Sequence, residues 1–237
     1  MKRQAALLAG VLAVASLMQP ARGDEGPKTA KESLQALNDF IGAWKGSGAP
    51  EKARPAANEI WSETVNWGWR FKGDDAWLTM EVMNGKYLKS GELRYLTDKK
   101  RYQLTAVDKK DRKVIFDGDL KDGYLTLDRV EPTSNEAQRL TMNLAGDGAR
   151  FIYRYSHKPA DRTLFIKDYQ VACTKEGESL GKQEKKIECV VSGGLGTIPV
   201  SFKGETFYVC CSGCKDAFNE NPEKYVAEFK AKKAGKK

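Results

Sequence analysis

Residues 60–174 consist of short runs in which apolar and polar side chains alternate, and this pattern restricts the fold more than any other feature. Alternation with a period of two is typical of β-strands, because successive side chains of a strand point to opposite faces of the sheet. The apolar positions of these runs include Val65, Trp67, Leu78, Met80, Leu93, Leu104, Phe116, Leu127, Leu140, Met142, Phe151, Tyr153 and Ile166. The pattern therefore predicts a mainly β domain of about nine or ten short strands.

The connections between the runs are short and rich in turn-forming residues, such as the pairs Asn84-Gly85 and Asp122-Gly123. Tight connections of this kind join antiparallel neighbours. A meander of so many strands buries its edges best by closing into an up-and-down barrel. The competing architecture is an open sandwich of two sheets. We therefore expect an antiparallel up-and-down β-barrel over residues 36–174.

The first predicted strand begins with Gly42-Ala43-Trp44. This Gly-x-Trp element, together with the strand spacing over residues 36–174, resembles the lipocalin-like (calycin) barrels, including domains of unassigned function in exported bacterial proteins. The resemblance implies that this tryptophan closes the barrel floor and that the barrel has an internal cavity, without identifying a ligand. Further tryptophans are candidates for lining that cavity, with core and rim packing as the simpler interpretation: Trp61, Trp67, Trp69 and Trp77.

Residues 1–23 have the three parts of a secretory signal peptide. The segment opens on a basic tripeptide, continues through apolar residues 5–18, and ends with small residues at Ala21 and Gly23. The apolar part is shorter than the roughly 20 residues that a membrane-spanning helix needs. We therefore expect cleavage before Asp24, a periplasmic or secreted protein, and no membrane span.

The formal net charge of +8 includes three basic residues of the predicted signal peptide. Without them, 37 Lys and Arg stand against 32 Asp and Glu, a net charge of +5. Opposite charges are interspersed along the chain, except in the basic tail at residues 233–237. No basic face for nucleic acid is therefore expected.

Composition also divides the chain into segments. Residues 24–35 are polar, and we expect them to be disordered up to the start of a short helix with Ser33 as its N-cap. Residues 175–186 are rich in Lys, Glu and Gly and read as a linker. They leave residues 187–232 as a small C-terminal module.

The five cysteines are confined to the C-terminal part of the chain: Cys173, Cys189, Cys210, Cys211 and Cys214. The disulfide framework of a small exported protein staples a loop-rich fold throughout. Cysteines clustered in this way belong instead to one local site.

The C-terminal module reads as a β-hairpin followed by helices. Apolar residues alternate on either side of residues 203–205, which mark the hairpin turn. Asn221 is the predicted cap of the last helix, with Pro222 at its first position. A unit of this size buries too little apolar surface to be stable alone, so a disulfide or a metal is expected to hold it.

The hairpin is expected to return the chain so that Cys210 lies near Cys189, with Cys214 close by in sequence. Three converging thiolates suit zinc(II) or copper(I). Zinc prefers a fourth ligand, for which Cys211 or water is available. The alternative is disulfide pairing among these residues, with Cys173 bonded to one of them. An odd number of cysteines leaves one thiol over in that scheme.

The order Cys189-x20-Cys210-x3-Cys214 resembles the TRASH/YHS family of small metal-binding modules. Residues 203–211 and 221–225 match the run that flanks those cysteines, while Val190 stands where members often have proline. The resemblance implies a treble-clef-like α+β module whose metal ligands are the same three cysteines. Members of this family occur in proteins that handle copper and other heavy metals.

Other reactive residues form no recognisable catalytic pattern. His157 is the single histidine and the only candidate for a haem ligand or a catalytic base, but no nucleophile motif accompanies it. Cys173 lies at the end of a predicted strand, where a cysteine is more often a buried or spare thiol than a metal ligand. We therefore predict that the protein is not an enzyme.

The sequence as a whole predicts an exported protein that binds zinc or copper through its C-terminal cysteines and acts as a carrier, buffer or sensor. In the alternative, the barrel binds a small hydrophobic ligand and the cysteine module is only a structural clip. The sequence does not predict the oligomeric state.

Overall fold

A computed structural model describes residues 29–176 and 187–235. The predicted signal peptide, most of the predicted linker and the last two residues of the basic tail lie outside the described residues.

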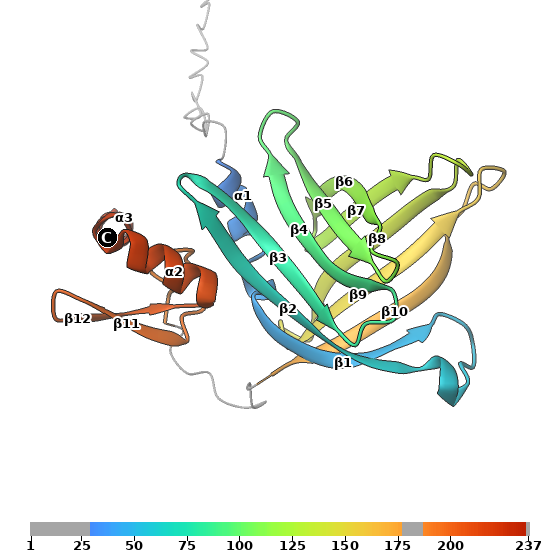
Figure 1. The fold of residues 1–237 in the computed structure, drawn as a ribbon, viewed down its shortest axis with the longest axis horizontal. Coiled ribbons are helices and arrows are strands. Elements are labelled where there is room, and N and C mark those ends of the chain that lie inside the picture. Colours follow the sequence, from blue (N-terminus) through green and yellow to red (C-terminus); the bar gives the residue numbers. More distant parts are fainter. Residues whose placement is uncertain (1–28, 177–186, 236–237) are drawn as a thin grey trace, which may run out of the picture.

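Ten antiparallel strands form a closed barrel (Figure 1). Each strand pairs with the next one along the chain, and β1 pairs with β10 to complete the closure, for example at Gly46 and Cys173. The mainly β fold and the barrel are therefore confirmed, and the open sandwich is wrong. The strands are β1 (Gly42–Pro50), β2 (Trp61–Lys72), β3 (Asp75–Met83), β4 (Leu88–Leu96), β5 (Arg101–Asp108), β6 (Lys113–Lys121), β7 (Tyr124–Val130), β8 (Ala137–Ala145), β9 (Arg150–Lys158) and β10 (Ile166–Lys175).

Turn chemistry explains the tight connections. Asp122 and Gly123 link β6 to β7 as a two-residue turn with φ values of 51° and 80°. Positive φ at both positions is the requirement of a type I′ turn, whose twist matches that of the flanking strands. Lys203 and Gly204 have φ values of 50° and 79° and form the equivalent turn in the C-terminal hairpin.

Two short helices lie against one end of the barrel: α1 (Ala30–Gln35) and the 3₁₀-helix η1 (Asn38–Phe40). The N-cap of α1 is Thr29, which forms a capping box with Glu32, so the prediction of Ser33 as the cap is wrong. The reciprocal hydrogen bonds of Thr29 and Glu32 satisfy the first free N–H groups of the helix. Ser33 is instead buried, and its carbonyl accepts a hydrogen bond of 2.8 Å from the Tyr102 hydroxyl.

Large aromatic side chains fill the barrel interior. Trp44 is fully buried, and its indole N–H donates a hydrogen bond of 2.7 Å to the Phe40 carbonyl. The Phe40 ring packs edge-on against Phe151, with centroids 5.1 Å apart. Trp67 and Trp69 are also fully buried, which makes them core residues rather than the rim of an open cavity.

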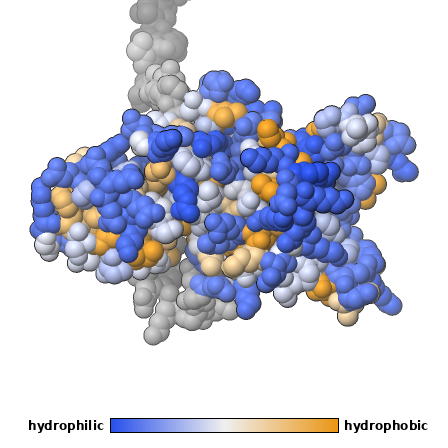
Figure 2. Space-filling model, viewed as in Figure 1, coloured by the Kyte–Doolittle hydropathy of each residue, from blue (hydrophilic) through white to orange (hydrophobic). Residues whose placement is uncertain are grey.

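The C-terminal region combines a two-stranded sheet with two helices: β11 (Ile198–Phe202), β12 (Glu205–Val209), α2 (Ser212–Glu220) and α3 (Pro222–Ala234). The Asn221 side chain caps α3 by accepting the Lys224 N–H, and Pro222 stands at the first helical position, as predicted. Within the described ranges, no helix has both the length and the apolar character needed to cross a membrane. The face of the molecule in Figure 2 is mainly hydrophilic, with small hydrophobic areas between.

The C-terminal region docks on the part of β2 that β1 leaves unpaired. The β1–β2 ladder ends where Gly42 pairs with Trp67, so among the described residues the rest of β2 has no strand partner on that side. Helix α2 packs there, with Gly213 directly over the Trp69 carbonyl. A side chain at position 213 would overlap that carbonyl. Glycine therefore allows the helix to cover an otherwise free strand edge.

Candidate metal centre

Three cysteines from separate segments meet at one point. Cys189 precedes a tight turn, Cys210 follows β12, and Cys214 lies in the first turn of α2. Their Sγ atoms all lie within 4.8 Å of one another. Cys189 and Cys214 are fully buried, whereas Cys210 is half-buried.

Backbone hydrogen bonds bring Cys189 to the hairpin. The Val190 N–H donates to the Tyr208 carbonyl at 2.9 Å, which holds this segment beside β12. The chain then turns sharply, with the Gly193 N–H donating to the Cys189 carbonyl at 2.9 Å and with φ of 76° at Gly193. Such a positive φ suits glycine. The expected return of the hairpin toward Cys189 is therefore confirmed.

The sulfur positions fit a metal ion of the predicted kind. Zinc–sulfur bonds of about 2.3 Å in a tetrahedral site place neighbouring sulfurs roughly 3.8 Å apart. The Cys210 and Cys214 Sγ atoms are 3.5 Å apart, and all pairs in the group lie within 4.8 Å. Changes of at most about 1 Å in these separations reach the sulfur spacing of a tetrahedral zinc site. Three sulfur ligands select soft or borderline ions, zinc(II) and copper(I) among them.

Hydrogen bonds distribute the thiol protons unequally. Hydrogen bonds from the Cys210 and Cys214 thiols lower the pKa of Cys189 far below that of an ordinary thiol. Burial raises the pKa of Cys214 well above its usual range. A bound ion would replace these protons, because a metal binds the thiolate.

Cys211, predicted as an additional ligand, lies outside the group of three. Its Sγ accepts a hydrogen bond of 3.4 Å from the Trp69 backbone N–H, and it lies 3.8 Å from the Cys210 Sγ. The hydrogen bond from Cys210 is the largest cause that lowers the pKa of Cys211, to about 3. The side chain therefore stands beside the cluster and contacts the barrel.

Ser192 connects the cysteines to the helical segment at the end of the barrel, and the sequence pattern did not predict this role. Its N–H donates to the Cys189 Sγ at 3.4 Å, and its hydroxyl lies 3.3 Å from the Cys210 Sγ. Its carbonyl accepts hydrogen bonds from Gln35 at 2.9 Å and from Asn38 at 3.0 Å. One sequence feature pointed to this contact: Gln35 and Asn38 are two amide side chains three residues apart, beside the apolar positions of the first helix.

A cleft of about 200 Å³ opens between the outer face of the barrel and the half-buried cysteines. Its barrel wall comes from β2 and β3 and carries Arg70 and Glu81. Its other wall contains Cys210 and Cys211. The cysteine centre is therefore reached from a polar cleft to which both parts of the protein contribute.

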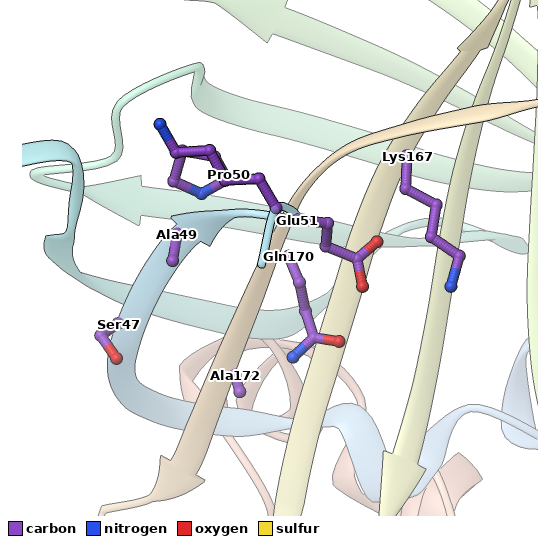
Figure 3. A pocket seen from close by; sticks show the side chains of 8 residues that line it. Ser47, Ala49, Pro50, Glu51, Lys167, Gln170 and Ala172 are labelled. Atoms are coloured by element: carbon purple, nitrogen blue, oxygen red, sulfur yellow. The ribbon is translucent and has the colours of Figure 1, made fainter. Parts of the chain in front are cut away.

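A second, larger groove lies on the outer face of the barrel, between β1 and β10 (Figure 3). It has a volume of about 520 Å³ and is lined by Glu51, Lys167 and Gln170 among others. The side chains that line it include no cysteine or histidine. Its size therefore does not make it the better candidate for metal chemistry.

His157 and Cys173 lie apart from the three-cysteine cluster. The His157 Nδ1 is 2.7 Å from an oxygen of Asp168, within a partly buried pair on β9 and β10. Cys173 is buried in the barrel wall, where burial raises its pKa to about 12.

These environments predict the reactivity of the thiols. In the folded, metal-free protein, the half-buried Cys211 should react rapidly with a thiol reagent at neutral pH, because its lowered pKa keeps it a thiolate and reagents attack exposed thiolates. Cys173 should react only after unfolding, because it is buried and stays protonated. Timed alkylation followed by peptide mass spectrometry measures each site. Rapid labelling of Cys173 in the native protein would contradict the assignment.

Comparison with the models of known protein families and with curated proteins finds no match for this chain. Its function is therefore argued from the geometry of the cysteine cluster.

Proposed function

We propose that this chain is an exported protein that binds a heavy-metal ion, zinc(II) or copper(I), through Cys189, Cys210 and Cys214, in the manner of a TRASH/YHS-type module. Its role is that of a carrier, buffer or sensor of the ion and not that of an enzyme. The observation that carries the proposal is the convergence of three sulfur atoms within 4.8 Å of one another.

Partial exposure favours an exchangeable ion over a permanent structural clip. Structural zinc sites usually have four protein ligands and are closed, whereas sites that act on exogenous ligands keep an open position. Here the group has three sulfurs, and one of them, Cys210, lies on the wall of a cleft. A three-thiolate site with access from solvent suits binding and release.

The location of the protein is part of the same proposal. Residues 1–23 have the pattern of a signal peptide, which supports a periplasmic or secreted protein. Thiols in such a compartment are exposed to oxidation. Burial of Cys189 and Cys214 slows that reaction and keeps them available to a metal.

The alternative function, a hydrophobic-ligand barrel, has less support. Trp44, Trp67 and Phe151 are buried together inside the barrel, and their rings contact one another. A ligand in this part of the barrel would have to displace these side chains. That alternative therefore stays a prediction from the sequence.

Elemental analysis of the mature protein, purified without oxygen from the exported fraction, tests the proposed function. We expect about one zinc or copper ion per chain, in accordance with a single three-sulfur site. Treatment with a chelator should remove the ion and make additional thiols reactive. A metal-free protein whose cysteines are already paired in disulfides, and which takes up neither zinc(II) nor copper(I) after reduction, would refute the proposal.

A further inference from the structure

We infer that the cleft between the barrel and Cys210 is the port through which the ion enters and leaves, and that Cys211 is the thiol that relays it. The inference rests on the proposed metal-binding function and adds a route and a role for the barrel. Four observations carry it: the two-sided lining of the cleft, the order of burial of the cysteines, the sulfur distances and the contact with Trp69.

The burial of the cysteines follows their distance from the cleft. Cys210 and Cys211 are half-buried and line the cleft, whereas Cys189 and Cys214 are fully buried and do not. An ion that reaches the centre from the cleft therefore meets Cys210 and Cys211 before the other two thiols.

Sulfur distances divide the four thiols into two overlapping sets. The Cys210 and Cys211 Sγ atoms are 3.8 Å apart, close to the separation of roughly 3.8 Å for two sulfurs on one zinc ion. The inner set is Cys189, Cys210 and Cys214. Cys210 belongs to both sets, so it can keep hold of an ion while Cys211 is exchanged for the two buried cysteines.

The barrel orients the relay thiol. The Trp69 backbone N–H, at the part of β2 that β1 leaves unpaired, donates a hydrogen bond to the Cys211 Sγ. This bond holds the sulfur at the boundary between barrel and module, beside the inner group. Arg70 and Glu81 add one charge of each sign to the opposite wall of the cleft.

The volume of the cleft selects the form in which the ion arrives. About 200 Å³ corresponds to roughly six or seven water molecules at about 30 Å³ each. A hydrated ion or its complex with one or two small ligands fits this space.

The relay is a sequence of ligand exchanges without change of oxidation state. Cys211 binds as a thiolate, Cys210 loses its thiol proton to solvent, and the two sulfurs replace two ligands of the incoming complex. Cys189 and Cys214 then form their sulfur–metal bonds, with loss of the Cys214 thiol proton to solvent, while the bond to Cys211 breaks and its sulfur is left as a free thiolate. Release runs through the same exchanges in reverse.

Rates of zinc transfer test the relay. The protein is loaded with Zn(II), and its transfer to an excess of a chromophoric chelator is followed by absorbance, with loading measured in the reverse experiment. In Cys211→Ser we expect both rates to fall by about tenfold or more, a barrier increase of about 1.4 kcal/mol, with the affinity for zinc nearly unchanged. If Cys211 were instead a permanent ligand, its loss would weaken affinity and accelerate removal, which is the opposite sign and would overturn the relay. Cys173→Ser is the matched control and should behave as wild type.

A second variant tests the port itself. Gly68 lines the cleft, and a Cβ there would have only an ordinary contact, 3.8 Å from the Thr79 Oγ1. Gly68→Leu should therefore fill the cleft without disturbing the barrel and should slow loading and removal by about tenfold or more, a barrier increase of about 1.4 kcal/mol. Ser62→Leu, on the exposed outer face of the same strand, is the control.

The outcomes distinguish the two proposals. If the wild-type protein binds no zinc(II) or copper(I), the proposed function fails and the port fails with it. If the wild type binds zinc but neither Gly68→Leu nor Cys211→Ser slows its transfer, metal binding stands and the port is wrong. Slowing in Gly68→Leu alone would support the port and remove the relay role from Cys211. Circular dichroism establishes that each variant is folded before its rates are compared.

Discussion

Replacement of Cys189 with serine should weaken zinc binding by about 1,000-fold, while the barrel stays folded. An apparent binding free energy of about 12 kcal/mol for a structural zinc site, divided over three thiolates, gives about 4 kcal/mol per ligand, and each 1.4 kcal/mol is tenfold in Kd. Cys189 is fully buried and shares the inner group with Cys210 and Cys214. A serine hydroxyl keeps the volume but is a poor ligand for a soft ion.

Competition titration with a chelator of known affinity measures this loss, and circular dichroism of the same sample reports on the barrel. Cys173→Ser removes a buried thiol outside the group of three and should leave the affinity unchanged. Wild-type affinity in Cys189→Ser would show that the ion is held elsewhere. Loss of the folded C-terminal region in the metal-free variant would support the structural-clip alternative.

Gly213→Ala should destabilise the docking of the C-terminal region on the barrel by about 3 kcal/mol or more, in the range of severe overpacking. A Cβ at this position overlaps the Trp69 carbonyl, which is backbone and cannot move aside without distorting β2. In an isolated helix the same change would stabilise by about 1 kcal/mol, because alanine has the higher helix propensity. The sign of the effect therefore separates docking from helix propensity.

Chemical denaturation and hydrogen exchange at the Trp69 amide measure the effect. That amide donates to Cys211, so it should exchange faster once the helix is displaced. The matched control is Gly235→Ala at the end of α3, where a Cβ would have an ordinary contact of 3.7 Å. Gly213→Ala that is as stable as wild type, with an equally protected Trp69 amide, would contradict the described interface.

The same variant connects docking to metal binding. Trp69 contacts Cys211 through its backbone and Asn38 through its indole N–H, and Asn38 in turn donates to the Ser192 carbonyl. Ser192 contacts the sulfurs of Cys189 and Cys210. Displacement of α2 therefore disturbs the supports of the cysteine cluster as well as the interface.

Much of the architecture could be predicted from the sequence because its signals are local. Alternation along a strand, the Asp122-Gly123 turn and the cap at Asn221 each depend on residues close together in the chain. The spacing of Cys189, Cys210 and Cys214 around one hairpin is a local signal too, and it predicted their convergence. The cap of the first helix was misassigned because Thr29 and Ser33 both precede apolar residues, and only the pairing with Glu32 distinguishes them.

Tertiary structure alone decided how the two parts meet. The contacts of Ser192 with Asn38 and of Cys211 with Trp69 join residues separated by 154 and 142 positions. A periodic pattern of apolar residues gives no information about contacts at such separations. The same is true of the cleft, whose walls come from different parts of the chain. Local sequence therefore determined the strands, the turns and the thiol cluster. Packing of α2 against the unpaired part of β2 decided that Cys211 contacts the barrel and lines the cleft, because that contact joins residues far apart in the chain.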